Sequence, residues 1–182
     1  MTEAILALAD GRIFRGHAFG ATGHTVGEVC FNTSMTGYQE ILTDPSYTDQ
    51  IMTFTYPHIG NVGINADDME SESVSVRGCI VRAPARKTSN YRAEADLADW
   101  LEQQGIVGIS GVDTRALVRH LRDHGAQNGV IASDGMSEAD ALGMARQDLQ
   151  VSSGHASRRK RLFARGDAVQ IAGRIEELLR NV

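Results

Sequence analysis

The chain has 182 residues, of which 42% are hydrophobic, and this length fits one ordinary domain with an extension or two very small domains. That apolar content excludes wholesale disorder, and the formal net charge of −5 gives no general attraction to nucleic acid or to anionic membranes. The two cysteines, Cys30 and Cys79, do not make a disulfide framework. The N-terminal residues lack the basic start and long apolar run of a secretory signal, and we therefore expect a cytoplasmic protein.

The first half of the chain predicts β-strands. Residues 4–8 and 12–20 flank the dipeptide Asp10-Gly11, which is a strong short-range signal for a hairpin. Further strands are predicted at residues 27–33 and 51–56, where side chains alternate between two faces, and at residues 73–82. The tetrapeptide at residues 44–47 predicts a turn, because Pro45 fixes its own φ angle and the preceding Asp44 can accept a hydrogen bond from the backbone that follows.

The second half predicts alternating helices and strands. A helix is expected over residues 93–104 and ends at Gly105, and a second begins at the capping residue Asp113 and ends at Gly125. Short apolar strands are expected at residues 106–110 and 129–133. A third helix is predicted from Ser137, which forms a capping box with Asp140. Strands followed by alternating helices and strands are typical of an α/β domain with a mixed sheet.

The segment from Gly27 to Gly63 is the most informative part of the chain. Turn formers and small polar residues separate short apolar runs in it, which is typical of elaborate binding loops on a scaffold. Its residues 27–51 and 55–63, together with residues 10–21 and 89–131, closely resemble the N-terminal domain of the carbamoyl-phosphate synthase small (glutamine-hydrolysing) subunit. The resemblance extends to Arg146, so a domain is expected at residues 1–146.

This resemblance carries specific expectations. It implies a layered β/β/α domain with a mixed sheet, of the swivelling-domain type. It implies a docking role against the large synthetase subunit and a position bordering the glutamine site, in the synthesis of carbamoyl phosphate for arginine and pyrimidine formation. ATP and divalent metal are expected on the large subunit, and no cofactor is expected in this chain.

The resemblance also implies individual site residues. Ser46 matches the serine that, in the family, reaches the glutaminase domain and helps to bind glutamine. The loops of residues 27–63 are the expected docking surface. Five residues represent that surface: Gly37, Tyr38, Tyr47, His58 and Asn61.

The sequence departs from the family pattern after Arg146. A class I glutaminase needs a cysteine on a sharp strand-to-helix turn and a distant His-Pro-Glu segment, but no cysteine follows Cys79 and no such segment occurs. We therefore expect that this chain does not catalyse glutamine hydrolysis alone. Residues 147–182 predict a solvated connector with a basic run at 158–161, followed by an amphipathic helix capped by Asp167.

Other functions are weighed against this assignment. A stand-alone hydrolase would use Cys30 or Cys79 as nucleophile with His58 as base, although free cysteines inside strand patterns are usually core residues. His120 and His124 have helical i, i+4 spacing but no acidic partner in sequence, so no metal site is expected. A non-functional product of gene truncation is the remaining alternative.

Overall fold

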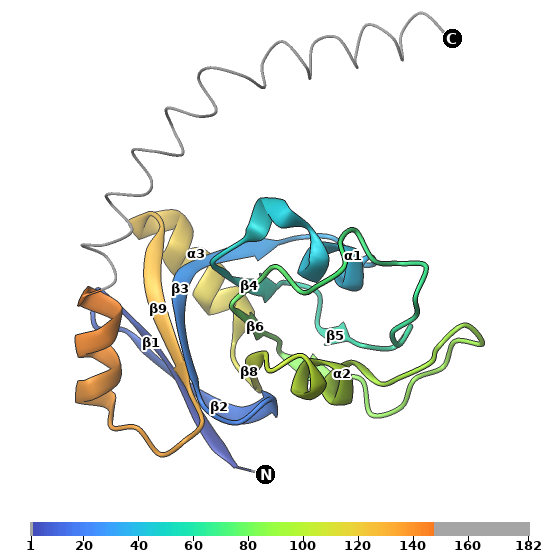
Figure 1. Ribbon diagram of the computed structural model, residues 1–182. Helices are drawn as coiled ribbons and strands as arrows, with labels where there is room; N and C mark the ends of the chain where they lie inside the picture. The colour runs from blue at the N-terminus through green and yellow to red at the C-terminus, as the bar shows by residue number, and fades with distance from the viewer. Residues whose placement is uncertain (1, 148–182) are drawn as a thin grey trace, which may run out of the picture. The chain divides into compact units, whose positions relative to one another are not determined.

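The computed structural model describes residues 2–147, and the connector and last helix predicted over residues 147–182 lie outside this range except for their first residue. In the described part, seven strands close into a mixed barrel in the order β1-β2-β8-β6-β4-β3-β9 (Figure 1). The strands are β1 (Glu3–Leu8), β2 (Ile13–Gly20), β3 (His24–Asn32), β4 (Gln50–Phe54), β6 (Gly78–Ile80), β8 (Val107–Ser110) and β9 (Gln127–Ala132).

The barrel has an antiparallel and a parallel part. β1 and β2 form the predicted hairpin around Asp10-Gly11, and β9 pairs antiparallel with both β1 and β3. β3, β4, β6 and β8 are parallel neighbours, so their carboxyl ends meet at one edge. β5 (His58–Ile59) and β7 (Ala83–Pro84) form a separate two-stranded parallel sheet.

The interior of the barrel holds the first core, which α3 (Thr114–His124) covers at one end. Leu117 and Leu121 of this helix pack against inward-facing strand residues. Those strand residues include Leu6, Leu8, Val29, Ile51, Ile80, Ile109 and Ile131. The interior is tightly filled, because a Cβ atom on Gly129 would lie 2.6 Å from a methyl group of Val29.

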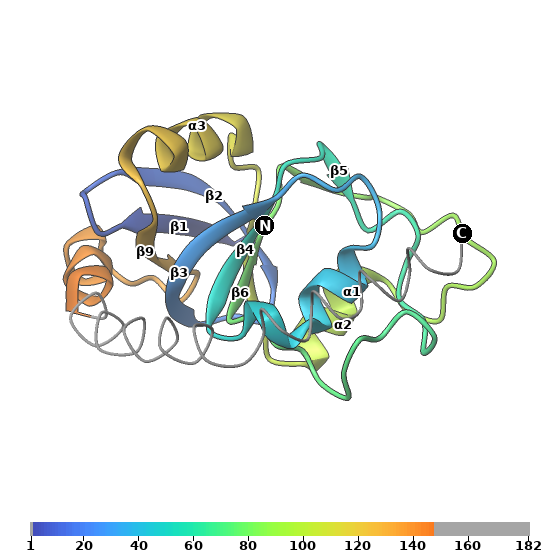
Figure 2. The same ribbon diagram turned by 90° about the horizontal axis from the view of Figure 1, so that it is seen from above.

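A second core lies on the outer face of β2, β4 and β6. There α1 (Tyr38–Thr43) and α2 (Leu97–Gln103) pack against side chains such as Phe54 and Cys79. We call α1, the 3₁₀ helix η1 (Pro45–Tyr47), β5, β7, α2 and their loops the outer lobe (residues 33–49, 55–77 and 81–106). Figures 1 and 2 show this lobe on the side of the barrel away from β1 and β9.

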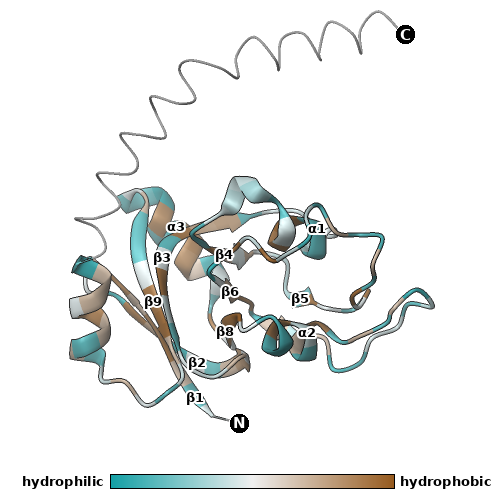
Figure 3. Ribbon diagram, viewed as in Figure 1, coloured by the Kyte–Doolittle hydropathy of each residue, from teal (hydrophilic) through white to brown (hydrophobic). Residues whose placement is uncertain are grey.

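A third, smaller core joins β1 and β9 to a helix that begins at Glu138 and runs to the end of the described part. The predicted N-cap Ser137 is confirmed, since the Asp140 backbone N–H donates to Ser137 Oγ at 3.2 Å. The Asp140 carboxylate accepts from the Ser137 hydroxyl at 2.6 Å, so the bond to the Ser137 backbone that would complete the predicted capping box is replaced by a side-chain bond. In Figure 3 the hydrophobic colour gathers on the barrel strands and α3, whereas the long loops of the outer lobe are mostly hydrophilic or neutral. None of the helices within residues 2–147 has the length and apolar content needed to cross a membrane.

The mixed α/β class predicted from sequence is confirmed, and the sheet proves to be closed into a barrel. The strand predicted over residues 73–82 is reduced to β6, which has three residues, and the helix predicted from residue 93 begins only at Leu97. The Asp113 cap is confirmed, because its carboxylate accepts from the Ala116 backbone at 3.0 Å. The layered β/β/α arrangement and the domain division at residue 146 stay predictions.

Candidate docking face around the Ser46 turn

Ser46 lies on one exposed turn of 3₁₀ helix, as the sequence predicted. Asp44 fixes the start of this turn, since its Oδ1 accepts from the Ser46 backbone N–H at 2.8 Å. Thr48 fixes the end, because its hydroxyl donates to the Pro45 carbonyl at 2.7 Å. With both ends held by short local hydrogen bonds, the Ser46 hydroxyl is displayed to solvent on a well-defined backbone.

Tyr47 connects this turn to the edge of the barrel. Its ring is half-buried against the second core, and its hydroxyl accepts from Asn32 Nδ2 at 3.4 Å. Asn32 ends β3, and its carbonyl accepts from the Thr55 backbone N–H at 3.1 Å just after β4 ends. Because β3 and β4 are parallel, the segments that follow them leave the barrel side by side.

Three exposed apolar side chains lie near the ends of β3 and β4. Phe31 is 37% exposed, Met35 is 68% exposed and Tyr56 is 39% exposed. Phe31 lies near the end of β3, Met35 follows that strand, and Tyr56 lies two residues after β4. These three residues are grouped by their places at the ends of two neighbouring parallel strands, where exposed apolar groups are available for contact with a partner. We call Phe31, Met35, Ser46 and Tyr56 the edge patch.

Sequence reasoning missed the apolar members of the edge patch. Strand alternation placed Phe31 on the same face as Val29 and so gave no sign that it is exposed where the strand leaves the barrel. Met35, a lone apolar residue between Ser34 and Thr36, was the available signal.

Four of the five predicted docking residues are at least partly accessible. His58 and Asn61 are exposed, and Gly37 and Tyr47 are intermediate. Gly37 precedes α1 with a left-handed φ of 76°, which is why a glycine is required there. Tyr38 differs from the others, because its side chain is only 4% exposed and its hydroxyl donates to the Gly63 carbonyl at 2.7 Å. Its side chain therefore holds two loops together from beneath the surface.

A buried polar network makes the loops of the outer lobe rigid. The Gln39 side chain donates to the Asn65 carbonyl at 2.6 Å and accepts from the Asn65 backbone N–H at 3.0 Å. The Thr43 hydroxyl donates to the Gln39 carbonyl at 2.9 Å and accepts from the Glu70 backbone N–H at 3.0 Å. Buried groups that satisfy one another in this way fix a loop in a single arrangement.

The cysteines do not form a nucleophilic site with His58. Cys79 is fully buried in the second core, and burial raises the pKa of its thiol to about 12. Burial and the nearby Glu28 carboxylate raise the pKa of the Cys30 thiol to about 12 as well. A hydrolase requires the thiolate, and both environments oppose its formation. His58 is exposed on β5 and makes no hydrogen bond to either sulfur within the described residues.

His120 does have an acidic neighbour, which sequence spacing could not reveal. Its Nε2 lies 2.5 Å from Oδ2 of Asp10, in the hairpin turn between β1 and β2. The rings of His120 and His124 stack with their centroids 4.3 Å apart, and His124 Nδ1 lies 3.0 Å from the His120 carbonyl. Within residues 2–147 no three histidine, cysteine or acidic side chains are arranged to hold a metal ion.

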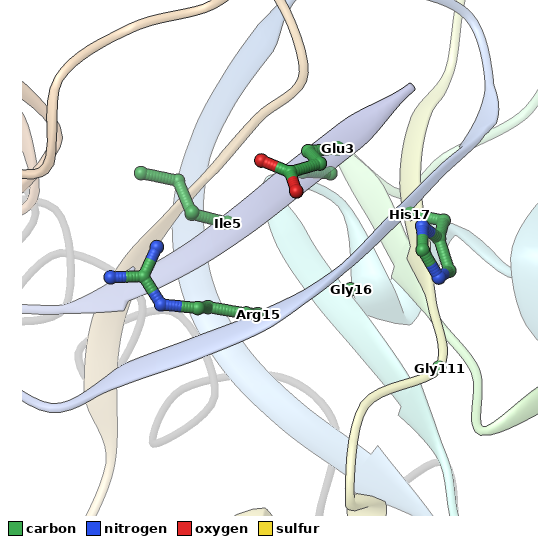
Figure 4. A pocket seen from close by; sticks show the side chains of 7 residues that line it. Glu3, Ile5, Arg15, Gly16, His17 and Gly111 are labelled. Atoms are coloured by element: carbon green, nitrogen blue, oxygen red, sulfur yellow. The ribbon is translucent and has the colours of Figure 1, made fainter. Parts of the chain in front are cut away.

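A cavity of about 280 Å³ lies elsewhere, outside the hairpin of β1 and β2. It is lined by Glu3, Ala4, Ile5, Arg15, Gly16, His17 and Gly111. Figure 4 shows Glu3, Arg15 and His17 spread along the two strands without converging on one point. Arg15 forms an ion pair with Glu138. None of the predicted site residues lines this cavity.

The family model described as "Carbamoyl-phosphate synthase small chain, CPSase domain" matches residues 6–131. The chain belongs to this family. Its match covers β2 to β8 completely, the second half of β1 and all of β9 except its last residue, so it includes the edge patch and the whole outer lobe.

Individual relatives agree with the family model. The chain is 58% identical over 144 residues to the carbamoyl phosphate synthase small chain of Parasynechococcus marenigrum (strain WH8102), covering 79% of this chain and 38% of the relative. It is 57% identical over 145 residues to that of Syntrophotalea carbinolica, with 80% and 39% covered. For Vibrio cholerae the identity is 55% over 146 residues, with 80% and 38% covered. The chain thus matches less than two fifths of the length of these relatives.

Proposed function

We propose that residues 2–147 act as the N-terminal assembly domain of a carbamoyl-phosphate synthase small chain. In this proposal the domain docks on the large synthetase subunit and borders the glutamine site, in the cytoplasm. The observation that carries the proposal is the family match over residues 6–131, which includes every loop of the outer lobe. A family named as a small chain implies a second, larger chain as partner.

The form of the outer lobe supports a docking role over a catalytic one. The Ser46 turn and the edge patch present a hydroxyl group and apolar side chains on a backbone that local hydrogen bonds hold in place. Such an arrangement is suited to contact a partner with little loss of entropy. The thiols, whose pKa values are raised to about 12, offer no nucleophile.

Ser46 is the residue that we assign to the glutamine site. An exposed hydroxyl that can donate and accept would complete a binding site whose other groups come from the glutaminase part of the assembly. We place ATP and divalent metal on the large subunit. The layered swivelling-domain arrangement is part of this proposal, with α1 and α2 as elements of the helical layer.

The test is co-purification of the full chain with the large synthetase subunit from the same source. Ser46→Trp should weaken binding at least tenfold, because the indole would displace the partner surface. Asp123→Trp is the matched control, since it places the same ring on an exposed site of α3, outside the outer lobe. Gly37 is unsuitable for this purpose because a tryptophan there would also strain the backbone at φ 76°. Equal binding by both folded variants would refute docking through the Ser46 turn.

A further inference from the structure

The loop between β7 and α2 carries the most exposed large hydrophobic side chain of residues 2–147, which is Tyr91. We call residues 85–95 the Tyr91 arm, and in Figures 1 and 2 the chain between β7 and α2 extends away from the barrel. Tyr91 is 96% exposed, compared with 68% for Met35, the next most exposed large hydrophobic residue of residues 2–147. An aromatic side chain that is almost entirely in water gains nothing from its own domain.

The backbone on both sides of Tyr91 is nevertheless held in place. The Ser89 backbone N–H donates to the Asn61 carbonyl at 3.0 Å, and the Ala93 N–H donates to the Asn90 carbonyl at 3.2 Å. Gly63 packs closely under the arm at a left-handed φ of 78°. A Cβ atom there would lie 2.6 Å from side-chain carbons of both Thr88 and Ala93. The arm therefore presents its tyrosine from an ordered base.

Arg92 anchors the arm from the other side. Its guanidinium donates to Asp68 at 2.9 Å, and to Asp67 and Asn65 at 3.4 Å each. Asp68 raises the pKa of Arg92, and hydrogen bonds from Asn65 and Arg92, together with the Arg92 charge, lower the pKa of Asp68. These contacts are internal to the lobe, so Arg92 serves to position its neighbour Tyr91.

The other charged residues of the arm are Arg86, Lys87 and Glu94. Arg86 and Lys87 are exposed, and within the described residues neither has an ion-pair partner. An exposed aromatic ring on a loop that is held at its base and also carries two unpaired cations fits an apolar pocket with an acidic rim on another protein. Nucleic acid is a poorer fit, because its phosphates are uniformly negative, whereas Glu94 on the arm is exposed and Asp67, beside Arg92, has an 84% exposed side chain.

We propose that the Tyr91 arm is a second docking element, separate from the edge patch, whose tyrosine enters an acidic-rimmed apolar pocket of the large synthetase subunit. This inference rests on the proposed function, since it names a further contact in the same assembly. Tyrosine is among the residues that most often dominate interface energy, and a backbone that is already held in place loses little entropy on binding. The cations would act mainly on the rate of association.

The experiment measures association and dissociation of the full chain with the isolated large subunit, for the parent, Tyr91→Ala, Tyr91→Phe and the double variant Arg86→Ala/Lys87→Ala. We expect Tyr91→Ala to bind about thirtyfold more weakly or worse, mainly through faster dissociation. Tyr91→Phe should bind within severalfold of the parent. The double variant should associate more slowly at low salt and show a smaller dependence on ionic strength. Ser46→Trp is measured in parallel.

The outcomes separate the two proposals. If the parent binds and Tyr91→Ala binds with the same affinity, the arm has no docking role and the proposed function still stands. Binding that Tyr91→Ala weakens and Ser46→Trp does not would support the arm and refute docking through the Ser46 turn. A folded parent that does not bind the large subunit overturns both. Because Tyr91 is 96% exposed, its replacement should leave the midpoint of urea unfolding unchanged. The same unfolding curve shows whether each variant is folded.

Discussion

Replacing Tyr38 with phenylalanine removes one hydroxyl group from beneath the candidate docking face. That hydroxyl donates to the Gly63 carbonyl at 2.7 Å and belongs to a side chain that is 4% exposed. Burial raises the pKa of Tyr38 to about 12, so the group stays protonated and acts as a donor at any working pH. The bond links the start of α1 to the loop that supports the Tyr91 arm.

The expected loss follows from burial and geometry. A buried hydrogen bond contributes about 1 kcal/mol net, and an acceptor left without a partner adds roughly another 1 kcal/mol. Tyr38→Phe should therefore lower the free energy of unfolding by about 2 kcal/mol and the Tm by roughly 4–8 °C. Tyr47→Phe is the matched control, because its half-buried hydroxyl only accepts a long contact of 3.4 Å and its removal should cost less than about 0.5 kcal/mol.

The assay is urea unfolding of both variants and the parent, monitored by the fluorescence of Trp100, the single tryptophan, which packs in the second core. The slope of the free energy against urea should be the same for all three, so that the midpoints alone report stability. If Tyr38→Phe and Tyr47→Phe lowered the free energy of unfolding equally, the prediction would be wrong, because burial and hydrogen-bond length would then not determine how much stability each hydroxyl contributes.

Three further predictions test other parts of the molecule. Among residues 2–147 the buried Thr53 hydroxyl has no hydrogen-bond partner, so Thr53→Val should raise the free energy of unfolding by about 1 kcal/mol in the same assay; a clear loss would mean that the hydroxyl has a partner. Burial raises the pKa of Asp10, but the Arg12 N–H and His120 outweigh it and lower the pKa overall. Its contribution to stability is therefore present above pH of about 4 and is lost as the pH falls through the lowered pKa, so Asp10→Asn should destabilise at pH 7 by roughly 1 kcal/mol or less and the difference from the parent should narrow as the pH falls below about 4. Finally, Cys30 and Cys79 should react slowly with a thiol reagent at pH 8 until urea unfolds the chain, because burial raises both pKa values to about 12; rapid labelling of either thiol in the native protein would revive the hydrolase alternative.

Local signals in the sequence were sufficient where neighbouring residues control the backbone. The Asp10-Gly11 hairpin, the Asp113 cap and the Asp44-Pro45 turn each depend on contacts within a few residues, and each lies where the sequence predicts it. α1 was missed because it has only six residues inside a segment rich in turn formers, where packing of Tyr38 and Leu42 against the second core stabilises the helix.

The residues of the candidate site also fall into two groups, those with a local signal in the sequence and those without one. Ser46 was identified from a four-residue turn and a family resemblance, and its exposure follows from that turn. The exposure of Phe31 and Tyr91 and the burial of Tyr38 have no local signal, because each depends on which distant segments cover the side chain. The sequence by itself thus determined the class of fold, the turns and caps, and the family. Only the tertiary structure decided that the sheet closes into a barrel, that Asp10 meets His120, and which aromatic rings are exposed, since these depend on contacts between residues far apart in the chain.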